Sequence, residues 1–199
     1  MSTRSSNFKV GVIVPSHFEA KFIEPGEFEL TVCGMGKVNG AWAVMELARR
    51  GASAILLTGL AGGLRELEIG DVITAEKIME GDYDASPVET DKHLSFAKRL
   101  RARWAKLACM VTQDRFLMKN EYPSAMLMPH PLATDMESYA VAFIGRRLGI
   151  PVYIVKIISD VADDKAHADF MKSCTAQAKR LNRVINDSVT EIRRELHGA

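Results

Sequence analysis

"TDMESYAVAFIGRRLGIPVYIVKIISDVAD" (residues 134–163) joins two structural patterns. In residues 136–149 apolar side chains recur at helical spacing, and the pattern ends in a glycine, as helices often do. Residues 151–160 are almost continuously apolar and rich in β-branched side chains, which is typical of a strand buried on both faces of a sheet. A helix that leads directly into such a strand predicts an α/β fold.

The rest of the chain continues this alternation of strand and helix patterns. We expect further strands at residues 9–15, 28–34, 52–59, 70–78 and 109–114, and further helices over residues 37–51, 91–108 and 166–197. Hairpin signals are few, and no internal repeat or linker is visible. The sequence therefore predicts one domain over residues 1–199, with a three-layer α/β/α architecture around a central mixed, largely parallel sheet.

The composition is that of an ordinary globular domain and excludes several classes of function. Hydrophobic residues make up 47% of the chain and charged residues 26%, with a net charge of +1, which argues against a nucleic-acid partner. Three scattered cysteines without CxxC spacing favour a reducing compartment, so we expect a cytoplasmic protein. No apolar stretch reaches about 18 residues and no signal peptide is evident, so we expect no membrane span.

Carboxylates stand where three of the expected elements begin or end. Glu19 follows the first strand, Asp160 follows the long apolar run directly after Ser159, and Glu137 begins a helix. In parallel sheets the carboxyl ends of the strands meet at one edge, where ligands bind. The glycine-rich residues 58–64 follow another strand and would allow a ligand to approach backbone N–H groups closely.

Each of these features also has a purely structural interpretation. Glu137 suits the N-terminus of a helix, Asp160 suits the cap of a turn, and Glu19 suits an exposed first turn. The glycines of residues 58–64 suit a tight turn without a ligand, and they match neither the Walker pattern nor GxGxxG. The five histidines have no metal-ligand spacing, so we expect no metal and no cofactor.

Taken together, these segments resemble the nucleoside phosphorylase and nucleosidase superfamily. Within it the chain is most similar to 5′-methylthioadenosine/S-adenosylhomocysteine nucleosidases. The similarity covers residues 9–163, in family order, through the segments VGVIVPSHFEA, CGMGKVNGAWA, LTGLAGGL, GDVITAEKIMEGDYD, TQDRFL, DMESYAVA and IISDVAD. The resemblance implies a nucleoside phosphorylase-like fold and cleavage of the N-ribosidic bond of a purine nucleoside.

The resemblance also implies a role for each of the three carboxylates. Asp160 would protonate the ring nitrogen at position seven of the departing purine. Glu137 would hold the ribose hydroxyls and stabilise the positive charge that develops on the sugar. Glu19 would act as the general base that takes a proton from the attacking water.

The same resemblance implies the binding residues. Met136 would pack on the sugar, Phe116 would stack on the base, and backbone groups of Leu117 would contact the edge of the base. Leu60 and Ser159 complete the expected substrate-binding set. The predicted partner is a small purine nucleoside such as methylthioadenosine or S-adenosylhomocysteine, with adenine as a product.

The residues at the expected nucleophile position favour water over phosphate. Phosphorylases of this superfamily carry arginines and a serine there, whereas this chain has Glu19, Leu57 and Leu60. A carboxylate and two leucines cannot bind a phosphate dianion, because burying the two like charges together is strongly repulsive. The sequence therefore predicts a hydrolase.

Departures from the family pattern leave alternatives open. Leu60 stands where nucleosidases usually carry a hydroxyl residue, Lys156 stands where arginine is usual, and the segment between Asp84 and Asp91 is short. A hopanoid-associated adenosyl nucleosidase or phosphorylase, or a nucleoside-binding member without turnover, would suit these differences. By the same resemblance we expect a homodimer, with Trp42, Tyr139 and Phe143 supplying an apolar interface.

Overall fold

The computed structural model describes residues 8–83, 93–115, 128–129, 131–161 and 166–197. Strands and helices alternate along most of this length, as the periodicity predicts. The elements are β1 (Val10–Val14), α1 (His17–Ala20), β2 (Glu29–Val32), α2 (Lys37–Arg49), β3 (Ala54–Arg65), β4 (Val72–Glu80), β5 (Leu94–Phe96), β6 (Lys106–Thr112), β7 (Leu132–Asp135), α3 (Ser138–Leu148), β8 (Val152–Val161), α4 (Ala166–Ala178) and α5 (Leu181–His197).

The strands form one mixed sheet. Its order is β2-β1-β3-β7-β6-β4-β5, and β8 pairs with both β3 and β4. The pairings β1–β2, β1–β3, β3–β8, β4–β6 and β6–β7 are parallel, whereas β3–β7, β4–β5 and β4–β8 are antiparallel. The strands β3, β8, β4, β6 and β7 therefore close a ring of pairings, and the largely parallel mixed sheet is confirmed.

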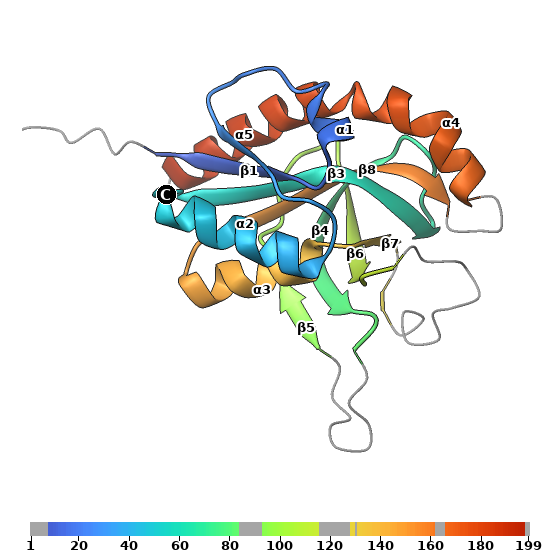
Figure 1. Ribbon diagram of the computed structural model, residues 1–199, viewed down its shortest axis with the longest axis horizontal. Coiled ribbons are helices and arrows are strands. Elements are labelled where there is room, and N and C mark those ends of the chain that lie inside the picture. Colours follow the sequence, from blue (N-terminus) through green and yellow to red (C-terminus); the bar gives the residue numbers. More distant parts are fainter. Residues whose placement is uncertain (1–7, 84–92, 116–127, 130, 162–165, 198–199) are drawn as a thin grey trace, which may run out of the picture.

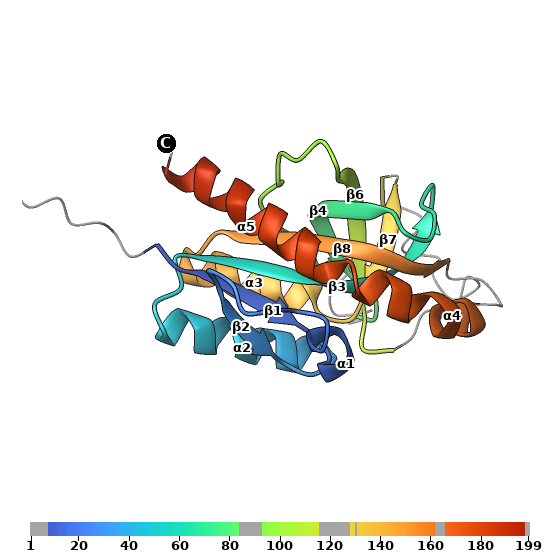
Figure 2. The same cartoon turned by 90° about the horizontal axis from the view of Figure 1, so that it is seen from above.

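Helices cover both faces of this sheet. Figure 1 shows α4 and α5 above the strands and α2 and α3 below them, and Figure 2 shows α5 crossing over β3 and β8. Side chains of β8 alternate between the two layers: Ile154 and Ile158 pack on the α2–α3 side, and Val155 and Ile157 pack on the α5 side. This alternation explains why the sequence of β8 reads as a continuous apolar run.

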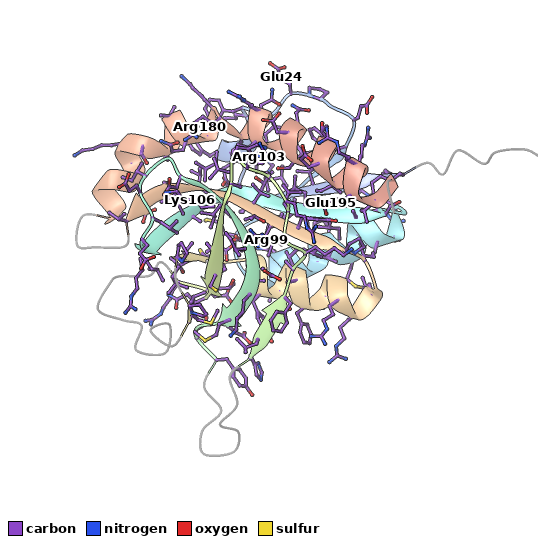
Figure 3. The ribbon with its side chains drawn as sticks, turned by 180° about the vertical axis from the view of Figure 1, so that it is seen from behind. Glu24, Arg99, Arg103, Lys106, Arg180 and Glu195 are labelled. Carbon is purple, nitrogen blue, oxygen red and sulfur yellow. The ribbon has the colours of Figure 1, made fainter. Side chains whose placement is uncertain are left out.

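The predicted helix over residues 91–108 is wrong. Over residues 93–108, the described part of this range, the chain forms β5, an irregular segment and the start of β6. Tertiary contacts replace the helical hydrogen bonds, because the N–H of Ala97 donates to the carbonyl of Glu76 and the N–H of Lys98 to that of Val152. Leu100 is fully buried, while basic side chains of this segment are exposed, and Figure 3 shows Arg99 and Arg103 among them.

The predicted helix over residues 166–197 is two helices. The chain turns at Lys179 and Arg180, between α4 and α5. The Arg180 guanidinium donates to the carbonyl of Gly70 at 2.8 Å, which ties this corner to the loop before β4. The apolar stripe expected on the second half is confirmed, since Leu181, Val184, Ile185 and Val189 are all buried.

Two further differences concern strands. Residues 132–135 form β7, which the sequence patterns did not predict, and the glycine-rich residues 58–64 continue β3 instead of ending it. The register of β3 against β8 shifts between Ala61 and Gly62, so the glycines mark an irregularity inside the strand. No helix in the described ranges combines the length and apolar character needed to span a membrane.

Candidate active site

A cavity of about 320 Å³ opens at the carboxyl ends of β1 and β8 and beside the middle of β3. This is the edge at which parallel sheets bind ligands. Six residues predicted for the site line it: Glu19, Leu60, Met136, Glu137, Ser159 and Asp160. The other two predicted residues, Phe116 and Leu117, lie outside the described part of the chain.

Glu19 is held by the start of its own short helix. Ser16 caps α1 through its hydroxyl, which lies 3.2 Å from the Glu19 N–H, and the Ser16 N–H donates back to Glu19 Oε2 at 3.0 Å. The side chain of Glu19 is 5% exposed, and its Oε1 accepts the Leu60 N–H at 2.7 Å. The sequence pattern Ser-x-x-Glu is a capping box, so Ser16 could have been found from the sequence.

Gly59 makes room for this carboxylate. Its φ of +134° is a conformation that favours glycine, and a Cβ there would come within 2.6 Å of Glu19 Oε1. The N–H of the next residue, Leu60, donates to this carboxylate. Glycine at this position serves the placement of Glu19, which the sequence alone did not reveal.

Asp160 lies near the end of β8 and is 3% exposed. The Ser159 hydroxyl lies 2.9 Å from Asp160 Oδ2 and 3.2 Å from the carbonyl oxygen of Ala61. A Cβ on Gly62 would come within 3.1 Å of Asp160 Oδ1, so the glycine of β3 leaves space beside this carboxyl group. The strand and its neighbour thus present Asp160 to the cavity.

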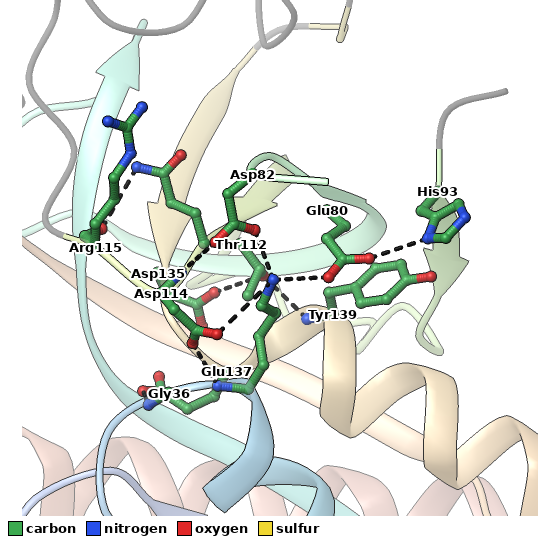
Figure 4. Close-up of polar contacts among 12 residues, drawn as sticks. Gly36, Glu80, Asp82, His93, Thr112, Asp114, Arg115, Asp135, Glu137 and Tyr139 are labelled. Carbon is green, nitrogen blue, oxygen red and sulfur yellow. Dashed lines mark hydrogen bonds and ion pairs between the residues drawn. The ribbon is translucent and has the colours of Figure 1, made fainter. Parts of the chain in front are cut away.

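Glu137 precedes α3 as its N-cap residue and is 3% exposed. Its Oε1 accepts the Gly36 N–H at 2.9 Å (Figure 4), and its Oε2 lies 3.6 Å from Lys156 Nζ. Burial raises the pKa of Glu137 to about 7, and the nearby Asp135 carboxylate adds to this shift. Lys156 and the Gly36 N–H act in the opposite direction.

Lys156 is fully buried on β8 between two carboxylates. Its ammonium nitrogen lies 3.0 Å from Asp135 Oδ2, closer than it lies to Glu137. Burial disfavours the charged amine, but the carboxylates of Asp135, Glu137 and Glu19 outweigh burial and raise the pKa of Lys156. The lysine therefore stays charged and balances part of the negative charge around the cavity.

Asp135 is the functional candidate that the sequence analysis missed. It ends β7 and lines the cavity, and it accepts hydrogen bonds from the Thr112 hydroxyl at 2.8 Å and the Ser138 hydroxyl at 2.6 Å. The Ser138 N–H also donates to it. Asp135 stands two residues before Glu137, the N-cap of α3, and its carboxylate accepts the N–H of the first helical residue, which no sequence pattern indicated.

Apolar side chains form part of the remaining wall of the cavity, beside the polar residues Ser16, Arg115 and Thr134. Phe18, Met35, Leu60 and Met136 contribute to it, and Met35 is 64% exposed at the rim. An apolar wall facing several buried carboxylates is suited to a ligand with a flat or aliphatic part and a part that carries hydroxyls or develops positive charge. The arrangement can supply a proton donor, a proton acceptor and anionic stabilisation within one cavity.

Residues 27–190 match the family described as the phosphorylase superfamily. The chain belongs to this superfamily. A similar relative is an aminodeoxyfutalosine nucleosidase from Campylobacter jejuni, 30% identical over 77% of this chain and 76% of the relative. A 5′-methylthioadenosine/S-adenosylhomocysteine nucleosidase from Oceanobacillus iheyensis is 26% identical over 82% of this chain and 81% of the relative.

Solved structures of superfamily members share the fold. The 5′-methylthioadenosine/S-adenosylhomocysteine nucleosidase from Helicobacter pylori, solved with butyl-thio-DADMe-Immucillin-A, superimposes with a TM-score of 0.81. The match covers 92% of this chain and 98% of that chain at 21% identity. The nucleoside phosphorylase-like fold is therefore confirmed, and the nucleosidase relatives confirm the prediction of an enzyme of that class.

Proposed function

We propose that the protein hydrolyses the N-ribosidic bond of a 5′-modified adenosine and releases adenine and the free sugar. The observation that carries this proposal is the convergence of Glu19, Glu137 and Asp160, from three separate elements, on one cavity. Together they provide the three functions that the reaction needs: an acid for the base, an anion for the sugar and a base for water.

The proposed reaction assigns one step to each carboxylate. Asp160 donates its proton to the ring nitrogen at position seven, and the electrons of the breaking C–N bond leave with the purine. Glu137, which sits beside the fully buried Lys156, stabilises the positive charge on the ribose and holds its hydroxyls. Glu19 takes a proton from water, whose oxygen bonds to the anomeric carbon.

The environment of Glu19 supports water as the nucleophile. The carboxylate is buried, and it accepts the Leu60 N–H that could otherwise donate to a phosphate. A phosphate dianion placed against Glu19 would face a buried like charge at short range. We therefore favour hydrolysis over phosphorolysis.

The nature of the 5′ group is a finer part of the proposal. The methylthio and homocysteinyl groups suit the apolar cavity wall formed by Phe18, Met35 and Leu60. An aminodeoxyfutalosine-type substrate is the second candidate, because a relative that bears this name is 30% identical to the chain. A long apolar tail, as in the hopanoid-associated alternative, would use the same wall.

A turnover screen tests reaction and substrate together. Adenine release would be followed in phosphate-free buffer for adenosine, methylthioadenosine, S-adenosylhomocysteine, aminodeoxyfutalosine and an adenosine with a long apolar 5′ tail. We expect release without phosphate, no acceleration when phosphate is added, and preference for the methylthio and homocysteinyl compounds. Sugar-1-phosphate as the product would contradict the proposal.

Calorimetry distinguishes a nucleoside-binding protein without turnover from the proposed hydrolase. Tight binding of methylthioadenosine with no adenine formed over hours would establish that role instead. The presence of the buried carboxylates argues against it, because burying several negative charges around a binding cavity is costly unless they act on the ligand.

We further propose that the protein is a cytoplasmic homodimer. Its three cysteines are unpaired, which suits a reducing compartment.

Tyr139 is only 9% exposed, so it packs inside the protein instead of at a dimer interface. An exposed apolar row runs along α2 instead and begins just before it: Met35, Val38, Trp42 and Met45 are each more than half exposed. Sedimentation should give a dimer, and Trp42→Glu should give a monomer; a monomeric wild-type protein would contradict this.

A further inference from the structure

A second lysine, Lys37, lies one residue from the backbone group that holds Glu137. The connection between β2 and α2 contains two glycines with left-handed φ angles, Gly34 at +88° and Gly36 at +102°. The N–H of Gly36 donates to Glu137 Oε1. Such a backbone conformation keeps its direction only if the neighbouring residues are anchored.

The side chain of Lys37 supplies a strong anchor. Its ammonium nitrogen lies 2.7 Å from Glu80 Oε1, 2.6 Å from Asp82 Oδ1 and 3.8 Å from Asp114 Oδ2. Its backbone N–H donates to Asp114 Oδ1 at 2.8 Å. Burial disfavours the charged amine, but the hydrogen bonds to Asp82 and Glu80 outweigh it and raise the pKa of Lys37, so the anchor stays charged.

The partners of Lys37 connect it to the opposite side of the cavity. Asp114 directly precedes Arg115, which lines the cavity. The Asp114 N–H donates to Asp82 Oδ2 at 2.8 Å, which joins the ends of β4 and β6 (Figure 4). Lys37 itself does not line the cavity.

We propose that Lys37 is a positioning residue: its contacts with Glu80, Asp82 and Asp114 fix the Gly36 N–H against Glu137. The inference rests on the proposed function, because it concerns the residue that stabilises the sugar cation. Lys37 affects the rate through the position of Glu137 and does not contact the substrate. A misplacement of about 1 Å in such a group can lower a rate about 100-fold.

The first test is kinetic. Lys37→Met should lower kcat roughly 10- to 100-fold, and Lys37→Arg, which keeps the charge, should recover most of it. The matched control is Lys106→Met, which removes a lysine whose ammonium lies 2.7 Å from Asp71 and whose side chain is 53% exposed. This control should keep wild-type kcat.

The second test does not need turnover. The Gly36 amide would be followed by ¹H–¹⁵N correlation spectra during a pH titration. In the wild type its shift should titrate with Glu137, near pH 7, whereas in Lys37→Met the amplitude should fall to less than about half, because the hydrogen bond is no longer fixed. If Lys37→Met does not fold, Asp82→Asn, which weakens the same anchor, should show a smaller loss of amplitude.

Adenine release by the wild type tests the proposed function, and the Gly36 titration tests the role of Lys37. A wild-type protein that releases no adenine would refute the function, and the Gly36 titration would still test the anchor. A Lys37→Met variant with wild-type kcat and an unchanged Gly36 titration would overturn the inference. A lowered kcat with an unchanged titration would also overturn it, since the effect would not act through Glu137.

Discussion

Two lysine–carboxylate clusters lie on either side of the Gly36 N–H, and burial makes them behave differently. In the inner cluster, Lys156 is fully buried against Asp135 and Glu137. In the outer cluster, Lys37 and its partners Glu80, Asp82 and Asp114 have side chains that are 14% to 45% exposed. The inner carboxylate Glu137 has a pKa raised to about 7 by burial, whereas hydrogen bonds from Lys37 and the Asp114 N–H outweigh burial at Asp82 and lower its pKa.

The difference shows how the same residue types serve distinct purposes. A buried carboxylate whose pKa lies near neutrality can change its charge during a reaction, and buried charges interact strongly. In the partly exposed outer cluster the pKa of Asp82 is lowered and that of Lys37 is raised, so this pair stays charged near neutral pH and acts as a fixed anchor. We therefore expect chemistry in the inner cluster and positioning in the outer one.

The largest expected difference is in rate. Glu137→Gln should lower kcat/KM by about 10²–10³-fold, because it removes the negative charge that stabilises the sugar cation. Glu80→Gln, the same change in the outer cluster, should have a much smaller effect, since Asp82 and Asp114 still hold Lys37. Steady-state adenine release measures kcat/KM of both variants. Equal losses of kcat/KM would contradict the different roles of the two clusters.

The next difference is in stability. Lys156→Met should lower the free energy of unfolding by about 3–5 kcal/mol, because it leaves two buried carboxylates without their cation. Lys37→Met should lower it by about 1 kcal/mol or less, because water and salt can reach the outer carboxylates. Urea unfolding of the two variants at pH 8 provides the measurement. A smaller loss for Lys156→Met than for Lys37→Met would contradict the assignment.

The pH dependence of Lys156→Met has a definite sign. Lys156 lowers the pKa of Glu137, so without it the folded-state pKa should rise above 7, further from the unfolded value of 4.5. Between these two values the folded state binds more protons than the unfolded state, so stability falls as pH rises. The variant should therefore have a higher urea midpoint at pH 5 than at pH 8, and a flat profile would contradict the raised pKa.

The wild-type rate should report the same ionisation. Because Glu137 must be charged to stabilise the sugar cation, kcat/KM should fall about tenfold per pH unit below about pH 7. In Glu137→Gln the residual kcat/KM should no longer fall below pH 7. If the fall persists in that variant, a group other than Glu137 causes it.

The smallest expected effect is that of salt. Raising NaCl from 0.1 M to 1 M shortens the screening length from about 10 Å to about 3 Å, which weakens exposed ion pairs and leaves buried ones nearly unchanged. The stability gap between wild type and Lys37→Met should narrow by a few tenths of a kcal/mol, whereas the gap for Lys156→Met should stay constant. Unfolding curves at both salt concentrations measure the two gaps.

Short-range patterns in the sequence were sufficient for the parts of the fold with clear periodicity. The strands β1, β3 and β8 and the helices α2 and α3 were predicted near their observed positions, because buried strands and amphipathic helices leave strong apolar patterns. Residues 91–108 were predicted wrongly, because their apolar spacing suits a helix while strand pairing with β4 and β8 determines the structure.

The sequence by itself placed Glu19, Glu137 and Asp160 at the ends of regular elements, since a charge beside a buried strand or at a helix start is visible in one dimension. Only the tertiary structure showed that Lys156 lies between Asp135 and Glu137, that Gly59 and Gly62 make room for two carboxyl groups, and that the Gly36 N–H donates to Glu137 beside the ion pairs of Lys37. These contacts join residues up to 101 positions apart in the chain. Their strength depends on burial and on distances of about 3 Å, which local sequence patterns do not encode.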